Sequence, residues 1–196
     1  MTLDDSWLPT TAYAVLGLLA IGEEHTAYEL KQRADATVAP IYWAPAMSAV
    51  YTELQRLEQL GLVRHRLEAE TENRSRRVYR ITAQGRRSLS DWIEHGRHDP
   101  TVVKNTTLLR LLFGHHTDPA VLTGRLDEHV EWARRELDDL DQALRDLKAD
   151  AAETSAYPAL VLEAAIATLR QELKITRDLA TRLRAANMHA SPGAQR

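Results

Sequence analysis

The densest group of chemically capable side chains lies at residues 74–87, where six arginines occur with no acidic residue among them. Guanidinium groups form paired hydrogen bonds with phosphate and carboxylate oxygens, so such a run is suited to binding an anionic polymer. Residues 46–90 hold nine Arg and five Glu, a local charge of +4, whereas the whole chain carries −3. The basic surface is therefore local, and the rest of the chain is acidic.

The remaining side chains with catalytic or metal-binding potential do not form a recognisable site. The chain has no cysteine, which excludes disulfides, thiolate metal sites and cysteine nucleophiles. His115 and His116 are adjacent, but no carboxylates accompany them at the spacing of a zinc motif such as HExxH. There is also no glycine-rich phosphate loop. We therefore expect no catalytic residue, no metal site, no cofactor and no enzymatic activity.

A helix is expected just before the arginine run, because apolar residues recur there at three- and four-residue steps. The repeat predicts a helix at about 46–60, which Gly61 ends. Small and hydrogen-bonding residues fall on the side away from the apolar stripe, as a helix that approaches base edges requires. These residues are Ser48, Ala49, Thr52, Gln55 and Arg56. An ordinary amphipathic helix with a solvated face would show the same pattern.

Two strand signals flank a polar turn after this helix. Alternation of apolar and polar residues predicts strands at 62–68 and 77–81, with an exposed turn at about 70–76. A basic tip on a two-stranded ribbon can contact phosphates or enter the minor groove of DNA. Arg74, Arg76 and Arg77 are therefore further candidates for DNA binding.

Two more helices precede this segment and one follows it. They are expected at about 9–21, at about 26–36, where the sequence TAYE forms a capping box, and at about 82–95. Three helices, a hairpin and a further helix predict a winged helix-turn-helix at 1–96, which includes a loose N-terminal arm. The expected fold class is mainly α with a small β-hairpin.

The second half of the chain predicts a helical domain at 101–188. An almost wholly apolar run, TLLRLLF at 107–113, is expected to lie in a buried helix. Two long helices follow at about 119–152 and 159–186, and the first carries a heptad seam over more than three heptads. Joined by a short turn, they form an antiparallel long-helix hairpin.

This hairpin has little to pack against within one chain, so we expect its apolar seam to mediate dimerisation. The seam residues are Leu126, Val130, Leu137, Leu140, Leu144, Leu162, Ile166, Leu169 and Leu173. The alternative is a bundle formed within one chain together with the preceding apolar helix. Residues 189–196 are expected to be a disordered tail.

The location of the protein and its ligands follow from weaker signals. The N-terminal sequence MTLDDSWLP is acidic and lacks an apolar run, so we expect no signal peptide and a cytoplasmic protein. No segment approaches the roughly 20 apolar residues that a membrane helix needs. Trp7, Phe113 and Trp132 are candidates to line an apolar pocket for a small aromatic ligand. For each of them, packing in a core or a dimer contact is the alternative.

The order of these motifs resembles the PadR family of bacterial transcriptional regulators. The matching segments are YAVLGLL at 13–19, AYEL at 27–30, VY at 50–51, GLV at 61–63 and YRIT at 79–82. The second half of the chain is similar in length and helical pattern to the longer branch of the family, which has a C-terminal helical dimerisation domain.

The resemblance implies a homodimer that binds double-stranded DNA at a palindromic operator. Members of the family are usually repressors, and some release DNA when they bind a small aromatic effector. The resemblance places Tyr51, with Ser48 and Thr52, on the recognition helix, and it places Arg74 and Arg76 on the wing.

One departure from the family concerns the start of the recognition helix. Many members carry a basic residue there, whereas residues 44–49 hold none. We therefore expect more of the binding to depend on Gln55, Arg56 and the wing. A winged helix can also serve as a protein–protein interaction module without specific DNA binding, which is the alternative function.

Overall fold

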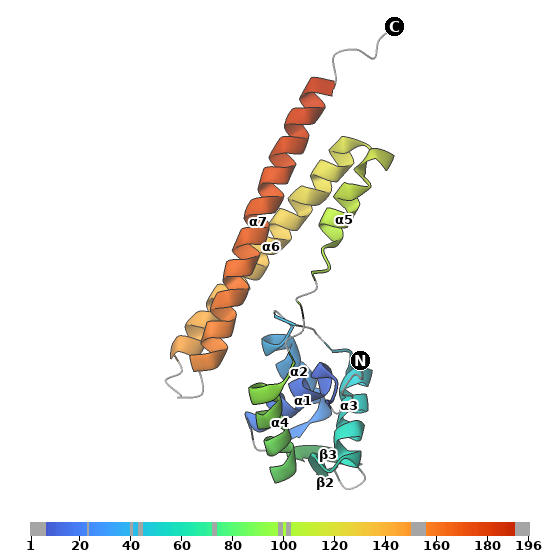
Figure 1. The fold of residues 1–196 in the computed structure, drawn as a ribbon, viewed down its shortest axis with the longest axis vertical. Helices are drawn as coiled ribbons and strands as arrows, with labels where there is room; N and C mark the ends of the chain where they lie inside the picture. Colours follow the sequence, from blue (N-terminus) through green and yellow to red (C-terminus); the bar gives the residue numbers. More distant parts are fainter. Residues whose placement is uncertain are drawn as a thin grey trace. The chain divides into compact units, whose positions relative to one another are not determined.

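The chain divides into two compact units, Met1–Pro100 (unit 1) and Thr101–Arg196 (unit 2). The computed structural model describes residues 7–22, 24–39, 41–42, 45–71, 74–97, 100, 103–149 and 156–190. Figure 1 shows helices in both units and a small sheet in unit 1. The predicted fold class, a mainly α winged helix-turn-helix followed by an antiparallel long-helix hairpin, is confirmed.

Within its described residues, unit 1 has four helices and a three-stranded antiparallel sheet with strand order β1-β3-β2. The elements in chain order are α1 (Thr10–Ala20), β1 (His25–Thr26), α2 (Ala27–Thr37), α3 (Met47–Gln59), β2 (Val63–Thr71), β3 (Arg74–Ile81) and α4 (Ala83–His95). The hairpin of β2 and β3 is longer than the predicted strands, because paired backbone continues through the polar residues that we expected to form a turn. Strand β1 was not predicted, since two residues carry no readable alternation.

Local signals in the sequence set the ends of these elements. Thr26 accepts a hydrogen bond from the backbone of Glu29, and the Glu29 side chain accepts one from the backbone of Thr26, which completes the predicted capping box of α2. Helix α3 ends at Gln59, and two residues later Gly61 adopts a φ of 70°, which side-chain-bearing residues rarely adopt. Thr82 caps α4 by accepting from the backbone N–H of Gly85.

The core of unit 1 lies between α1, α2, α3 and the inner face of the sheet. Its largest fully buried side chains are Leu16, Leu19, Leu30, Leu54, Leu57, Val50 and Val63. The ring of Tyr13 stacks on that of Trp92, with centroids 4.7 Å apart and planes 7° from parallel. This contact ties α4 to α1, and the core as a whole fixes one face of α3 and leaves the other exposed.

Unit 2 consists of α5 (Thr106–Leu112), the 3-10 turn η1 (Gly114–His116) and two long helices, α6 (Pro119–Ala149) and α7 (Ala156–Ala190). Ion pairs show that α6 and α7 run antiparallel, because higher positions on α6 meet lower positions on α7. Arg184 contacts Asp127 at 2.5 Å, Arg170 contacts Asp141 at 3.0 Å and Lys148 contacts Glu163 at 2.6 Å.

Two expectations for unit 2 need correction. The apolar helix α5 is not buried. None of its residues is buried, and Leu109 and Leu112 are 52% and 69% exposed. A seven-residue helix turns only one side to its neighbour, so apolar residues all around it cannot all be covered. The predicted disordered tail also begins too early, because α7 continues to Ala190, and residues 191–196 lie outside the described part of the chain.

Within the described residues, no helix combines the length and the apolar character that crossing a membrane would require.

Candidate nucleic-acid interface

Helix α3 separates a buried face from a polar exposed face, as its sequence pattern predicted. Val50, Leu54 and Leu57 are at most 1% exposed. Ser48, Tyr51, Thr52 and Gln55 are exposed, whereas Ala49 and Arg56 are half-buried. The hydroxyl of Thr52 donates to the carbonyl oxygen of Ser48 at 2.9 Å. Its oxygen therefore remains available as an acceptor, which is the role needed to meet the amino group of adenine or cytosine.

Arg56 pairs with a buried acid that sequence reasoning overlooked. Glu53 is 8% exposed, and its Oε1 accepts a hydrogen bond from the Thr11 hydroxyl of α1 at 2.9 Å. Its other oxygen lies 3.5 Å from Nε of Arg56. The sequence did carry a signal for this burial, because Glu53 lies three residues after Val50 and four before Leu57, on the buried side of the helix. Arg56 is thus engaged in an ion pair within α3, although 43% of its side chain stays exposed.

The register of the hairpin assigns its arginines to opposite faces. Leu67 pairs with Arg77 and His65 with Tyr79, and the last of these packs into the core. Because side chains alternate along a strand, these residues share the inner face, toward α3. Arg64, Arg66, Glu68, Arg76 and Arg80 fall on the outer face. Two neighbouring wing arginines, Arg76 and Arg77, therefore have different surroundings.

A groove of about 400 Å³ lies between α3 and the inner face of the wing. Its lining residues are Tyr51, Gln55, Glu58, Gln59, Arg77 and Tyr79. It brings together three residues that we expected to contact DNA: Tyr51, Gln55 and Arg77. The acid in the groove is not free, because Glu58 contacts the ring of His65 on β2.

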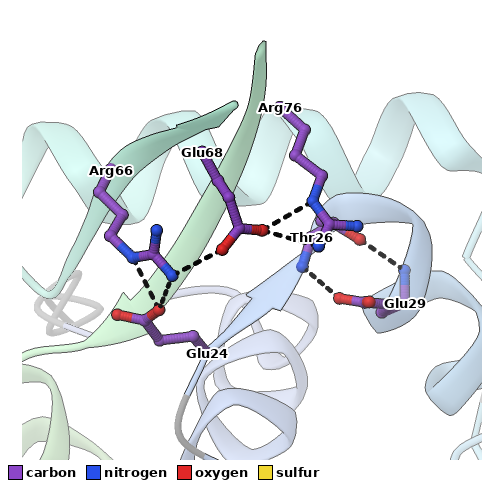
Figure 2. Close-up of polar contacts among 6 residues, drawn as sticks. All are labelled: Glu24, Thr26, Glu29, Arg66, Glu68 and Arg76. Carbon is purple, nitrogen blue, oxygen red and sulfur yellow. Dashed lines mark hydrogen bonds and ion pairs between the residues drawn. The ribbon is translucent and has the colours of Figure 1, made fainter. Parts of the chain in front are cut away.

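The outer face of the wing carries a chain of alternating charges, which Figure 2 shows. Glu24 accepts from Nε of Arg66 at 2.8 Å, and Arg66 also donates to Glu68 at 3.0 Å. Glu68 in turn accepts from Nε and Nη2 of Arg76 at 2.8 and 2.7 Å. We call these four residues the outer network. They link the segment before β1 to both strands of the hairpin.

The outer network shifts the titration of its own groups. Hydrogen bonds from Arg76 and then Arg66 lower the pKa of Glu68, and the hydrogen bond from Arg66 lowers the pKa of Glu24. The same contacts raise the pKa of Arg66. Each shift has the same cause, since a hydrogen bond between opposite charges favours the charged form of both partners. The four groups therefore remain ionised and paired at neutral pH.

The other wing arginines complete the picture. The side chain of Arg74 lies outside the described residues, although its backbone is part of β3. Arg64 and Arg80, which we had not singled out, are exposed and face each other directly across the hairpin. Their pairing could have been anticipated only from the strand register, which the sequence leaves open by one residue in either direction.

The aromatic residues considered for ligand binding fall in both units. Trp7 packs against the core of unit 1, and its ring centroid lies 6.4 Å from that of Tyr13. In unit 2, Phe113 is 55% exposed at the end of α5. Trp132 of α6 is 45% exposed, and its ring lies 5.2 Å from that of His129.

Polar contacts surround this second tryptophan. His129 lies 3.1 Å from a carboxylate oxygen of Glu172 on α7, and the same oxygen accepts from the Asn105 side chain at 3.0 Å. Among the described residues, no group of three or more His, Asp or Glu side chains is placed to hold a metal ion.

The residues expected to mediate dimerisation lie in the seam between α6 and α7 of one chain. The cluster contains Val130, Leu137, Leu140, Ile166, Leu169 and Leu173, with Leu144 and Leu162 packed against it. Leu126 of α6 is 2% exposed. The heptad residues of α6 are therefore buried against α7 of the same chain.

Comparison with known proteins supports both halves of this description. Residues 15–91 match the family described as "Transcriptional regulator PadR-like family", and residues 103–186 match the one described as "Virulence activator alpha C-term". A curated relative, the "Negative transcriptional regulator PadR" of Bacillus subtilis (strain 168), is 24% identical over 139 residues, which cover 71% of this chain and 75% of the relative.

Solved structures show the same fold across nearly the whole chain. The structure of Bacillus subtilis PadR with operator DNA has a TM-score of 0.76 at 20% identity, covering 89% of this chain and 99% of that one. The Vibrio cholerae virulence activator AphA has a TM-score of 0.66 at 20% identity, covering 90% and 99%. Consecutive matches thus account for both units: the winged helix matches the PadR-like family of transcriptional regulators, and the helical domain matches a family named after the C-terminal part of a virulence activator.

Proposed function

We propose that the chain is a homodimeric repressor that binds a palindromic operator beside a nearby gene and leaves it when a small aromatic molecule binds. The observation that carries the proposal is the groove in which Tyr51 and Gln55 of α3 face Arg77 of the wing. A polar helix face beside a phosphate-binding cation provides base reading and backbone contact in one surface.

The residues of α3 suit a reading of bases through neutral groups. Gln55 can form paired hydrogen bonds with adenine, and Thr52 offers an acceptor. Arg56 is engaged by Glu53 and lies partly buried. The exposed face of α3 therefore carries little charge, and we expect the wing to contact the DNA phosphates.

Repression is supported by the name of the Bacillus subtilis relative, a negative regulator. The match of residues 103–186 to a family named after a virulence activator favours the opposite sign of regulation. A reporter gene placed behind the upstream DNA distinguishes the two, since repression predicts higher expression when the chain is deleted.

The homodimer is supported by apolar surface that one chain leaves uncovered. Leu108, Leu109 and Leu112 of α5 are 44%, 52% and 69% exposed, and Phe113 beside them is 55% exposed. A cluster of exposed large apolar side chains is typical of an association surface. Two winged helices held by such a contact would read half-sites about 34 Å apart on one side of the duplex.

The effector is proposed to bind near Trp132. This ring is half-exposed beside His129, and a structure of Bacillus subtilis PadR with p-coumaric acid shows that one protein of this fold holds an aromatic acid. We expect Trp132→Phe to abolish a fluorescence change on adding aromatic acids. An effector that releases DNA equally from this variant would place the ligand elsewhere.

The proposed function is tested by fluorescence anisotropy with a duplex from the DNA upstream of the gene and a scrambled duplex of equal length. The wild-type chain should prefer the upstream duplex. Arg77→Gln should weaken binding to both duplexes and reduce the slope of log affinity against log salt by about 0.9, the value for one phosphate contact. Arg97→Gln, which removes an exposed arginine that follows α4 and lies outside the arginine run, is the matched control and should leave the slope unchanged. Equal affinity of the wild-type chain for the two duplexes would contradict sequence-specific regulation.

A further inference from the structure

We propose that Glu68 is a specificity-determining residue of the DNA interface: its carboxylate occupies the guanidinium groups of Arg66 and Arg76 and so withholds both from non-operator DNA. The inference rests on the proposed function, and it concerns a residue that makes no contact with DNA. It assigns different roles to the two faces of the wing.

The geometry of the outer network leaves little capacity for an incoming phosphate. One oxygen of Glu68 accepts from Nε and Nη2 of Arg76, and the other accepts from Nη2 of Arg66. Nε and Nη2 of Arg66 are further engaged by Glu24, at 2.8 and 2.7 Å. Two acids and two arginines leave a formal charge of zero. A phosphate that pairs with Nε and Nη2 of either arginine must first displace a carboxylate from them.

Arg76 also lies close to a second acid, Glu29, in the first turn of α2. Figure 2 shows Arg76 beside the capping box of α2, where Glu29 already supplies negative charge at the helix N-terminus. The pKa of Glu29 is lowered mainly by the Thr26 backbone N–H and also by the charge of Arg76. Acids of the same chain thus balance the charge of Arg76 and the positive end of the α2 dipole, so neither needs a DNA phosphate as its partner.

Arg77 on the inner face has no such restraint. It lines the groove with Tyr51 and Gln55, and among the described residues it takes part in no ion pair. Among the described side chains of the wing, Arg77 is the cation that lines the groove beside Tyr51 and Gln55. Non-specific affinity rises with the number of phosphates that a protein neutralises, whereas base contacts add affinity only at the right sequence. Keeping Arg66 and Arg76 occupied therefore widens the difference between operator and other DNA.

The test uses Glu68→Gln in the full-length chain, with a scrambled duplex of about 30 base pairs as the probe and salt as the variable. Glutamine keeps the size of the side chain but carries no charge. We expect binding to the scrambled duplex to tighten about threefold or more at low salt, with a salt slope steeper by about 0.9 for each arginine released. Preference for the upstream duplex should fall accordingly. Adding Arg76→Gln to this variant should return the slope toward the wild-type value.

Glu94→Gln is the matched control, because it removes one exposed acid of α4 from the same unit. If both glutamate variants change affinity and slope equally, the effect is one of net charge and the proposal is wrong. It is also wrong if Glu68→Gln weakens binding to the scrambled duplex or binds no duplex while its circular dichroism is that of the wild-type chain. Failure of the wild-type chain to distinguish the upstream duplex contradicts the proposed function instead, and the comparison of the two glutamate variants still decides the role of Glu68.

Discussion

On the exposed side of α3, the hydrogen bond from Thr52 to the Ser48 carbonyl makes a prediction about base reading. Thr52→Val keeps the shape and removes the acceptor oxygen. We expect affinity for the upstream duplex to fall about fivefold or more, as for the loss of one base contact, while binding to a scrambled duplex stays nearly unchanged. The measurement is anisotropy with both duplexes at one salt concentration.

A matched control exists on α2. Thr37 is exposed and donates to the Arg33 carbonyl at 2.8 Å, which is the same local bond on another helix. Thr37→Val should leave both affinities unchanged. An equal loss of affinity for both duplexes in Thr52→Val would show that the hydroxyl contacts backbone or supports the helix.

Sequence pattern placed single residues well where one periodicity decided the matter. The apolar stripe of α3 correctly left Ser48, Thr52 and Gln55 exposed, because buried leucines fix the rotation of the helix. It did not separate Arg76 from Arg77, because we expected residues 70–76 to form a turn, whereas Arg76 lies on strand β3 and alternation there turns the two side chains to opposite faces. The pairing of Arg56 with Glu53 is local, since the two lie three residues apart on α3, but the hydrogen bond that Glu53 accepts from Thr11 depends on how α1 packs.

At the scale of elements, the capping box of α2 links stability to pH. The Thr26 backbone N–H donates to Glu29 at 2.7 Å, and this bond is the main reason that the pKa of Glu29 lies below its ordinary value of 4.5. A carboxyl whose pKa is lowered by folding stabilises the fold above its ordinary pKa. That contribution is lost as the pH falls through the lowered value.

We therefore expect Glu29→Gln to lower the melting temperature most at neutral pH, with the difference from wild type shrinking below pH 4.5. Thr26→Ala removes the cap acceptor instead, costs about 1 kcal/mol and keeps most of its effect in acid. Melting curves followed by circular dichroism from pH 7 to about pH 3 check both. A Glu29→Gln difference that does not vary with pH would contradict this account of the capping box.

Two glycines of unit 1 predict opposite effects of the same substitution. A Cβ on Gly85 would lie 2.2 Å from the Leu62 carbonyl oxygen and 2.8 Å from Cγ1 of Ile81, so α4 would have to move away from the sheet. A Cβ on Gly17 of α1 would meet no heavy atom within 4 Å. In urea denaturation, Gly85→Ala should destabilise by about 1–3 kcal/mol, whereas Gly17→Ala should stabilise by about 0.5–1 kcal/mol. Equal effects of the two changes would contradict this packing.

Most helices of both units could be read from the sequence because each has a cap or a long apolar repeat. The wing was harder, since strand pairing continues into polar residues through backbone hydrogen bonds that no side-chain pattern records. Helix α5 shows the limit of composition as a guide. Its leucines predicted burial, but what covers an apolar helix depends on neighbours that one sequence does not name.

For the molecule as a whole, the heptad seams of α6 and α7 could pack against each other within one chain or against a second copy of the chain. Their heptad residues pack against each other within one chain, so the same seam is not left open for a second copy. Apolar surface that remains exposed in unit 2 includes α5 with Phe113 beside it, and also Tyr157 and Leu160 of α7. We therefore propose that a homodimer would use surface outside the seam, with α5 as the first candidate.

Leu112→Asp tests this assignment without touching the seam, because Leu112 is 69% exposed at the end of α5. A buried contact does not tolerate an unpaired charge, so we expect the variant to be a monomer with wild-type helicity. Ile93→Asp is the control, since Ile93 of α4 is also 69% exposed but lies in unit 1. Light scattering coupled to size-exclusion chromatography should give the dimer mass for the wild type and Ile93→Asp, and half that mass for Leu112→Asp.

A monomer carries one winged helix and contacts one half-site, so its preference for the palindromic duplex should fall together with its mass. A Leu112→Asp chain that remains dimeric would move the contact away from α5.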